Sequence, residues 1–324
     1  VNKDSDSEYT IELTADFSVK GFYITSPHKT TILGSGHTLT MGVGGTVSVK
    51  KGAELTLGAA DGNVLNIRSA EGTSNDAPGM LNIEGICNMY SGVTLSGREG
   101  NNYFGGGVTV SGGTFHMYGG TIEKCGIKGG SVCYGGGVAV VYGGQFIMDS
   151  GTIRDCYVES DYIVDWAPNT CFTAMGGGVF VSGGSYFRMN GGSISSNRAT
   201  NMGGGVAVAI SYDEIANSGY TYGTLKSSAE ILGGKVEENQ AKKGAGLFAS
   251  GYYYAFADAI CADTPAAGAT KNPGLHIKDT QILNNTATDT EEGRGGGVLV
   301  VALKSPAAAS VENATVKENK ATTG

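Results

Sequence analysis

The chain has 324 residues, a formal net charge of −8 at pH 7 and 55 glycines, but only 6 prolines. Glycine lies far above its usual share of roughly 7%, yet there is no collagen-like triplet and 40% of the residues are hydrophobic, so the glycines indicate tight corners in a folded chain. The acidic balance, without a basic cluster, argues against a nucleic-acid partner. No apolar run approaches the roughly 18 residues that would span a membrane.

Residues 8–104 alternate apolar and polar residues in short runs, after a polar start that does not resemble a signal peptide. Residues two apart lie on one face of a β-strand. The inward-facing pairs predicted in this way are Tyr9 and Ile11, Val47 and Val49, Leu55 and Leu57, Leu65 and Ile67, Leu81 and Ile83, and Val93 and Leu95. We expect residues 1–104 to form irregular rungs of a coil and to include an N-terminal cap.

From residue 105 to the end, one short motif recurs at unequal intervals. GGGV or a close variant begins at Gly105, Gly135, Gly176, Gly203, Gly244 and Gly295. Each copy is followed by further apolar runs in the same order, and the length changes fall between the runs. This pattern is typical of a solenoid, whose units must stack on their neighbours while their corners are free to grow.

Aligning the units produces three apolar ladders. The first run contributes Val108, Val138, Val179, Val206, Leu247 and Val298, and two places on Val110, Val140, Val181, Val208, Ala249 and Val300. The second contributes Phe115, Phe146 and Phe187, and two places on Met117, Met148, Met189, Ile231, Ile277 and Val311. The third contributes Ile122, Ile153, Ile194, Val236, Ile282 and Val316. We therefore predict an all-β fold, a right-handed parallel β-helix with three short strands per rung, rungs roughly 4.8 Å apart and a single domain over residues 1–324.

A corner column follows the third run. Three residues after each aliphatic come Cys125, Cys156, Asn197, Asn239, Asn285 and Asn319. Two places later come Ile127, Val158, Ala199, Ala241, Ala287 and Ala321. Stacked asparagines can pass amide hydrogen bonds from rung to rung while satisfying the backbone of the turn. We expect Asn197, Asn239, Asn285 and Asn319 to form such a ladder.

These motifs resemble the repeats of the polymorphic outer-membrane proteins, within the pectin-lyase-like parallel β-helix superfamily. The resemblance is carried by Gly203–Val206 with Ile194–Asn197 and by Gly295–Val298 with Ile282–Asn285, and it covers roughly residues 105–324. It implies a β-helical adhesin that is secreted or displayed on a bacterial cell surface.

Three insertions fall between the first and second runs of successive units, at Ile210–Ser228, Ser250–Gly274 and Ala302–Ala309. Loops at one corner of adjacent rungs must be neighbours in space. The candidate ligand-binding residues in them are Tyr212, Tyr220, Tyr222, Tyr252, Tyr253, Tyr254 and Phe256. Aromatic side chains are typical of recognition surfaces, but the same rings could instead pack the loops onto the flank of the coil.

Two further features suggest structural roles. A fourth excursion, Tyr157–Met175, holds Trp166 and several acids but no calcium-loop motif. The sequence also contains no C-x-x-C motif, which argues against a zinc site. We therefore predict no metal and no cofactor. Cys125 with Cys156, and Cys133 with Cys171, lie one rung apart and are candidate disulfides. The alternative for the first pair is a stack of buried thiols. Cys87 and Cys261 are predicted to be unpaired.

No catalytic set emerges from the sequence. The outward pairs Glu123-Lys124 and Arg154-Asp155 are expected to neutralise one another across rungs. The sequence favours a non-enzymatic adhesin or stalk that binds a protein or glycan on a host or neighbouring cell. The alternative is a carbohydrate-active enzyme, a polysaccharide lyase or glycoside hydrolase, with its site built by the same loops.

Because Asn319–Gly324 stop where another GGG run is due, we expect the native protein to continue.

Overall fold

The computed structural model describes residues 7–74, 78–101, 104–129, 132–160, 173–211, 224–250, 252–254, 257–258, 260–261, 269–270, 273–290, 293–301 and 309–322. All regular elements in these residues are β-strands. In this part of the chain no helix has the length and apolar character needed to cross a membrane.

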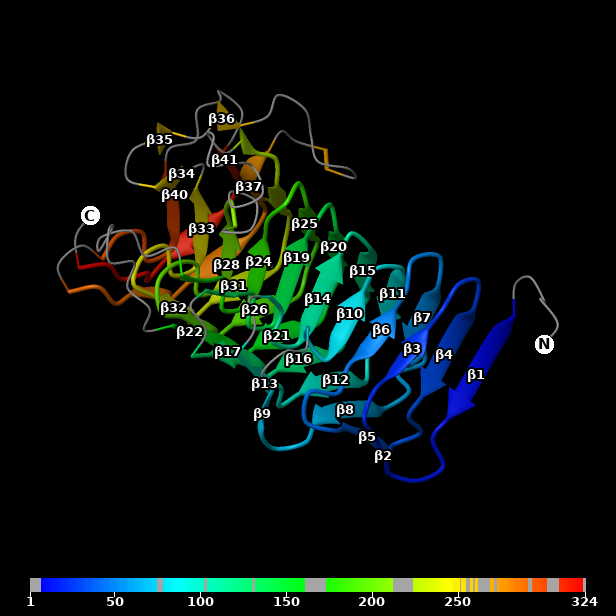
Figure 1. Ribbon diagram of the computed structural model, residues 1–324. Helices are drawn as coiled ribbons and strands as arrows, with labels where there is room; N and C mark the ends of the chain where they lie inside the picture. Colours follow the sequence, from blue (N-terminus) through cyan, green and yellow to red (C-terminus); the bar gives the residue numbers. More distant parts are fainter. Residues whose placement is uncertain are drawn as a thin grey trace.

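The strands stack along one axis from the N-terminal to the C-terminal end (Figure 1), and each turn adds one parallel strand to each of several sheets. Sheet A consists of β1 (Glu8–Glu12), β4 (Lys29–Leu33), β7 (Glu54–Leu57), β11 (Ile86–Met89), β15 (Thr114–Met117), β20 (Gln145–Met148), β25 (Tyr186–Met189), β30 (Ser228–Ile231), β37 (Gly274–Lys278) and β41 (Ala309–Glu312). Sheet B consists of β2 (Phe17–Val19), β5 (Thr38–Met41), β8 (Leu65–Ser69), β12 (Val93–Ser96), β16 (Thr121–Glu123), β21 (Thr152–Arg154), β26 (Ser193–Ser195), β31 (Lys235–Glu237), β38 (Gln281–Leu283) and β42 (Thr315–Lys317).

Two more sheets complete the wall of the coil. Sheet C consists of β3 (Phe22–Ile24), β6 (Val47–Val49), β10 (Leu81–Ile83), β14 (Val108–Ser111), β19 (Val138–Val141), β24 (Val179–Val181), β28 (Val206–Val208), β33 (Leu247–Ser250) and β40 (Val298–Val301). Sheet D consists of β9 (Thr73–Ser74), β13 (Glu99–Gly100), β17 (Gly126–Lys128), β22 (Tyr157–Glu159), β27 (Arg198–Ala199), β32 (Gln240–Ala241) and β39 (Thr286–Ala287). The chain runs through C, A, B and D in each regular turn, so the fold is a parallel β-helix.

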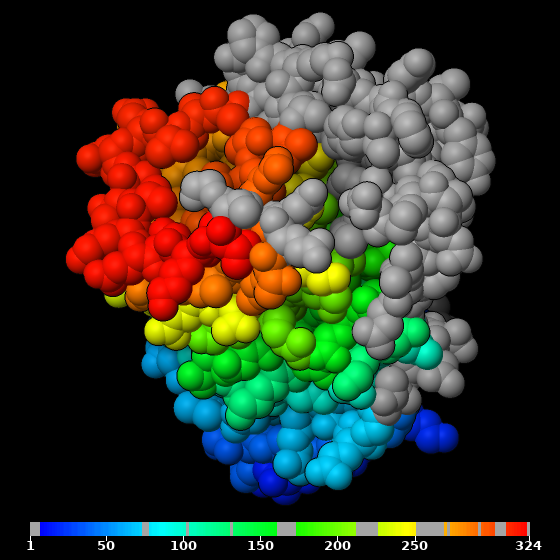
Figure 2. All heavy atoms as spheres, turned by 90° about the vertical axis from the view of Figure 1, so that its left-hand side faces the viewer, coloured from blue at the N-terminus to red at the C-terminus, as the bar shows by residue number. Residues whose placement is uncertain are grey.

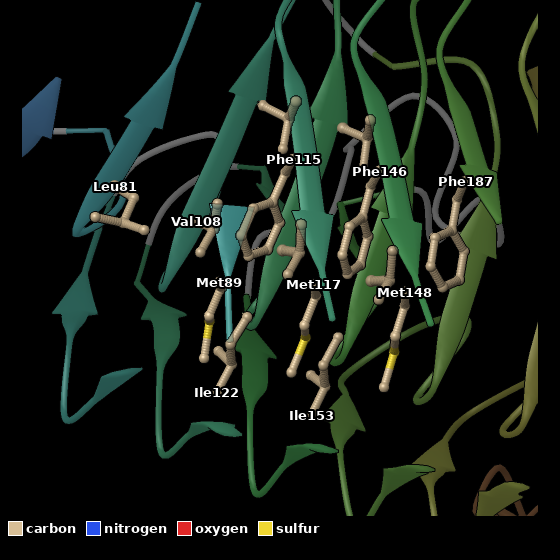
Figure 3. Packing of buried hydrophobic residues seen from close by; sticks show 14 of the residues in the cluster. Leu81, Met89, Val108, Phe115, Met117, Ile122, Phe146, Met148, Ile153 and Phe187 are labelled. Atoms are coloured by element: carbon tan, nitrogen blue, oxygen red, sulfur yellow. The ribbon is translucent and has the colours of Figure 1, made fainter. Parts of the chain in front are cut away.

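The predicted apolar ladders are confirmed by the strand register. Val138 pairs with Val179 in sheet C, and Ile153 pairs with Ile194 in sheet B. In sheet A, Phe146 lies between Phe115 and Phe187, with ring centroids 5.0 and 4.9 Å apart. Figure 3 shows these rings side by side, with the methionine and isoleucine columns beneath them. The inward faces of sheets A, B and C thus form one continuous core.

Sheet D is an addition to the three strands predicted for each rung. Its inward residues are the predicted column of Ile127, Val158, Ala199 and Ala241, which forms a small core of its own with Cys133 and Ala174. One boundary of the predicted excursion at Tyr157–Met175 is wrong, because Tyr157–Glu159 is strand β22 of this sheet. At the other boundary, β23 (Ala174–Met175) pairs with β18 (Cys133–Tyr134).

A second apolar layer covers the outer face of sheet C. Tyr134 stacks on Phe180 with ring centroids 4.5 Å apart, and both are buried with Val141, Met175 and Phe248. Sheet C in these turns is therefore buried on both faces. The continuous apolar runs VAVV and VFV carry this signal in the sequence, because strands buried on both faces lose the alternation of polar and apolar residues.

The asparagines of the corner column are joined by side-chain hydrogen bonds. Asn197 Nδ2 donates to Asn239 Oδ1 at 3.0 Å, Asn239 Nδ2 to Asn285 Oδ1 at 3.0 Å, and Asn285 Nδ2 to Asn319 Oδ1 at 2.9 Å. Each Nδ2 also donates to a backbone carbonyl one rung below, and each Oδ1 accepts a backbone N–H. The residue before each column member has a φ of 53° to 59°: Lys124, Asp155, Ser196, Glu238, Asn284 and Glu318. The side-chain ladder thus stabilises the left-handed turns that precede its asparagines.

The thiols of Cys125 and Cys156 are free and buried, so of the two alternatives for this pair the structure shows the stack of buried thiols and not the disulfide. Cys156 Sγ lies 3.8 Å from the carbonyl oxygen of Ile122, the position in the rung below that an asparagine Nδ2 contacts further along the column. Cys133 Sγ donates to the carbonyl of Glu159 at 3.6 Å. Its predicted partner, Cys171, lies outside the described residues. Cys87 is also a free thiol, buried in the core.

The first and last described turns carry inward residues that are partly exposed. In the first turn Ile11 is 47% and Phe17 58% exposed, and the predicted N-terminal cap is not among the described residues. In the last turn Val311 and Val316 line a hollow together with Asn319 and Gly295–Gly297. Figure 2, which looks at the C-terminal end, shows this hollow encircled by red and orange residues.

Candidate recognition face

The predicted binding residues lie on the insertions between sheets C and A, and the structure describes these insertions in part. Tyr212, Tyr220, Tyr222 and Phe256 lie outside the described residues. Tyr252, Tyr253 and Tyr254 form β34 (Tyr252–Tyr254), whose side chains are likewise not described. The backbone of β34 pairs antiparallel with β35 (Ala257–Asp258).

The first two insertions contact each other, as expected for loops at one corner of adjacent rungs. β29 (Thr224–Leu225) of the first insertion pairs with β36 (Ile260–Cys261) of the second, in parallel register. Figure 1 shows β34, β35 and β36 beyond the ends of β28 and β33, off the wall of the coil. We call residues 210–228 and 250–274 together the insertion module.

The second insertion is also attached to the outer face of sheet A, through the buried carboxylate of Glu230 on β30. Thr270, within the insertion, donates its backbone N–H to Glu230 Oε1 at 2.6 Å and its hydroxyl to Oε2 at 2.8 Å. Tyr186 donates its hydroxyl to Oε2 at 3.0 Å, and Arg188 Nη2 lies 3.3 Å from the same oxygen. Glu230 is fully buried. Such burial is tolerated only where hydrogen bonds and an opposite charge replace water.

Arg188 and Tyr186 connect this carboxylate with the turn below. The guanidinium of Arg188 lies 5.4 Å from the ring centroid of Tyr186 and is partly exposed, whereas Tyr186 is buried. Burial and the neighbouring Glu230 carboxylate raise the pKa of Tyr186, so that its hydroxyl remains a proton donor at neutral pH. The two residues therefore hold the Glu230 carboxylate in one place on the scaffold.

An aromatic and polar column continues on the exposed part of sheet A, away from the insertion module. Tyr90 stacks on Tyr118 with centroids 4.8 Å apart, and Tyr118 stacks on His116 at 3.8 Å. His116 Nε2 lies 2.6 Å from Asp149 Oδ2, and Asn190 Nδ2 donates to Asp149 Oδ1 at 2.7 Å. Both carboxylate oxygens of Asp149 thus have partners on neighbouring rungs, which makes this column a cross-strand stabilising feature.

The pKa of Asp149 predicts an acid-sensitive contribution to stability. Burial raises this pKa, but the hydrogen bonds from Asn190 and His116 outweigh burial and bring it below its ordinary value. A depressed carboxyl pKa stabilises the fold above the unfolded pKa of about 4 and loses this effect as the pH falls through the folded pKa. We expect Asp149→Asn to lower the free energy of unfolding by about 1 kcal/mol at neutral pH. In strong acid the same substitution should leave the free energy of unfolding unchanged.

Denaturant unfolding at several pH values measures this difference. The exposed Glu71→Gln is the matched control, because it removes a carboxylate without touching the column. A deficit in Asp149→Asn that persists unchanged in strong acid would contradict the assignment.

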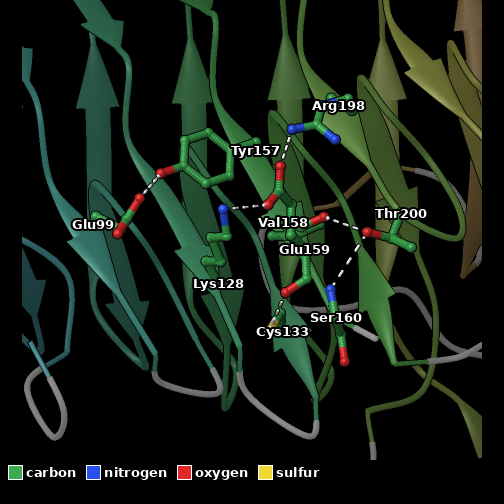
Figure 4. Close-up of polar contacts among 9 residues, drawn as sticks. All are labelled: Glu99, Lys128, Cys133, Tyr157, Val158, Glu159, Ser160, Arg198 and Thr200. Atoms are coloured by element: carbon green, nitrogen blue, oxygen red, sulfur yellow. Dashed lines mark hydrogen bonds and ion pairs between the residues drawn. The ribbon is translucent and has the colours of Figure 1, made fainter. Parts of the chain in front are cut away.

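Polar contacts on the outer face of sheet D form a separate network (Figure 4). The hydroxyl of Tyr157 donates to the carboxylate of Glu99, two rungs below. Glu159 pairs with Lys128 Nζ at 3.3 Å and also with Arg198. The acids of this face are thus matched by donors one or two turns away. In sheet B, Glu123 and Arg154 of adjacent turns form the predicted ion pair at 2.6 Å.

Gly126 is required beneath the Tyr157 ring. A Cβ at position 126 would lie 2.5 to 2.6 Å from three atoms of that ring, so Gly126→Ala must displace the ring and break the contact with Glu99. We expect a loss of about 1–3 kcal/mol in the free energy of unfolding. Gly42→Ala is the control, since its Cβ would lie 3.5 Å from the nearest atom. Equal losses in the two variants, measured by urea unfolding, would refute the steric explanation.

The described residues contain no group of three or more His, Cys, Asp or Glu side chains arranged to hold a metal ion. The carboxylates of Asp149, Glu159 and Glu230 are each engaged by donors of the protein itself. Sequence reasoning missed Glu230, although its position in the outward column with His116 and His276 could be read from the repeat.

Fold and surface together define a parallel β-helix whose coil carries an insertion module at one corner. Comparison with known protein families, with curated proteins and with solved structures finds no match to this chain. Its class therefore rests on its own strand register and on the corner column.

Proposed function

We propose that the protein is a non-enzymatic β-helix adhesin or stalk, secreted or displayed on a bacterial cell surface. In this proposal the insertion module binds a protein or a glycan on a host or neighbouring cell. The observation that carries it is the strand pairing between β29 and β36, which joins two aromatic-rich insertions of successive turns into one unit.

Preorganisation of the backbone favours binding by such a unit. A recognition surface gains affinity when its large side chains are presented on backbone that is already ordered, because less conformational entropy is lost on binding. Tyrosine offers a large contact area with a polar end, which suits both glycan rings and protein surfaces. The insertion module combines a high density of tyrosines with attachment to a stiff coil.

A carbohydrate-active enzyme is the second candidate, since acids of the insertions could complete a site. Such an enzyme needs a proton donor and a base placed on either side of a sugar linkage. The pairing of Asp149, Glu159 and Glu230 with protein donors speaks against these carboxylates in that role.

Binding to an array of neutral and acidic oligosaccharides, and to intact host cells, tests the proposal. We expect binding by the wild-type chain and its loss when Tyr252–Phe256 is replaced by a glycine-serine linker of equal length. Tyr23→Ser, which removes a tyrosine that is 70% exposed at the other end of the coil, should bind like the wild type. Turnover of a polysaccharide that depends on acids of the insertions would instead favour the enzyme.

A further inference from the structure

We infer that Glu230 is a positioning residue that clamps the insertion module onto sheet A and thereby sets the orientation of its aromatic strand. This inference rests on the proposed function, since the module is the proposed binding surface. The attachment itself, however, is a separate physical claim about Glu230 and Thr270, and it is measurable without any ligand.

The burial of Glu230 distinguishes it from the residues at the same register position in turns without a long insertion. Its register position on the outer face of sheet A is taken in other turns by Asn88, His116, Ile147, Arg188, His276 and Ser310. In the turns that carry no long insertion at this corner, His116 and Ile147 are partly exposed. Glu230 is fully buried, and Thr270 of the insertion lies against it.

The hydrogen bonds divide into two pairs with different roles. Tyr186 and Arg188 both belong to β25, one turn below, and they fix the carboxylate relative to the coil. The N–H and the hydroxyl of Thr270 then bind the two carboxylate oxygens, one each. A single residue of the insertion is therefore held at two points by one rigid acceptor. Charge-assisted hydrogen bonds of this kind are among the strongest in proteins.

A second attachment limits the freedom of the same segment. β36 pairs with β29 of the preceding insertion, and Thr270 lies nine residues after Cys261. The chain between β33 and β37 is thus tied to the neighbouring insertion at one point and to sheet A at another. Among the described residues of this segment, the Glu230 contact and the short β29–β36 pair are the two attachments between the ends of β33 and β37.

Glu230→Gln and Thr270→Val test the clamp with little change in shape. The glutamine removes the charge and one acceptor oxygen, whereas the valine removes only the hydroxyl donor of Thr270. Glu54→Gln is the matched control, because Glu54 is also on sheet A and accepts a hydrogen bond across rungs, from Asn88 Nδ2 at 2.9 Å. It lies several turns away from the insertion module.

Peptide-resolved hydrogen–deuterium exchange on the full chain is the primary measurement. We expect Glu230→Gln to speed exchange at least tenfold in residues 251–273, Thr270→Val to do so more weakly, and Glu54→Gln to leave that segment unchanged. The double variant should match Glu230→Gln alone, since both changes act on one contact. Exchange that is unchanged in Glu230→Gln, or that rises equally in all turns, overturns the inference.

Retention on the oligosaccharide array tests whether the Glu230 contact affects binding. If the clamp positions the module, Glu230→Gln should lose retention in proportion to its faster exchange, while Glu54→Gln keeps wild-type retention. If Glu230→Gln exchanges faster in residues 251–273 but is retained on the array as fully as the wild type, the positioning role is overturned. A wild-type chain that is retained by no oligosaccharide or cell would refute the proposed function, and the exchange data would still decide whether Glu230 clamps the insertion.

Discussion

Replacing Asn239 by alanine is expected to lower the free energy of unfolding by about 3–5 kcal/mol. The Asn239 side chain is fully buried and makes four hydrogen bonds. Its loss leaves the backbone N–H of Asn197 and the carbonyl of Ile194 without these side-chain partners in a site closed to water. Each buried group orphaned in this way costs about 1–3 kcal/mol, and the truncated side chain leaves a cavity as well.

Two matched variants separate hydrogen bonding from volume. Asn239→Cys places in the column a residue that it already contains at Cys125 and Cys156, so we expect about half the loss of the alanine variant. Asn319→Ala removes the last member of the ladder, which is only half-buried and open to water, and should cost about 1 kcal/mol. Urea unfolding of the full chain compares the three variants. Equal losses in all of them would show that the ladder contributes no more than packing.

Phe146→Ala is expected to have an effect of similar size, about 3–5 kcal/mol. The ring is fully buried between Phe115 and Phe187, so its removal opens a cavity lined by two aromatic rings that cannot collapse without bending sheet A. Stacked rings also attract each other beyond the effect of area, by about 0.5–1.5 kcal/mol per pair. The variant therefore loses two such contacts along with the buried apolar surface.

The controls for Phe146 lie in the same strand. Phe146→Leu keeps most of the volume and should cost about 1.5 kcal/mol. Ile147→Ala changes the next residue, which faces outward and is partly exposed, and should cost about 1 kcal/mol or less. Guanidinium unfolding of all three variants provides the comparison. A larger loss in Ile147→Ala than in Phe146→Ala would mean that the inward and outward faces of sheet A have been exchanged.

Much of the coil could be predicted because a stacked fold repeats its contacts. Val138 lies on Val179, and Ile153 lies on Ile194, because each rung places an equivalent residue above and below. Sheet D could not be predicted as a sheet, because strands of two or three residues are too short to show a period. The left-handed turn before each corner residue was equally hidden, since Lys124, Ser196 and Glu238 are not residues that mark such a conformation.

The candidate site was less accessible than the fold. The positions of the insertions in the repeat predicted that they are neighbours, and the pairing of β29 with β36 confirms this for the first two. The attachment through Glu230 left no pattern in the sequence. An outward glutamate on a β-helix strand is solvated in most contexts, and only the contact with Thr270, forty residues away, makes it a buried anchor.

The sequence by itself determined the winding of this protein, because period-two apolar runs and a recurring corner residue can be satisfied together only when equivalent residues stack. The tertiary structure alone decided which outward side chains are buried. Glu230 is covered by an insertion of its neighbouring turn and Phe180 by β18 and β23. Such coverage depends on where irregular segments lie across the coil, and no local periodicity encodes that.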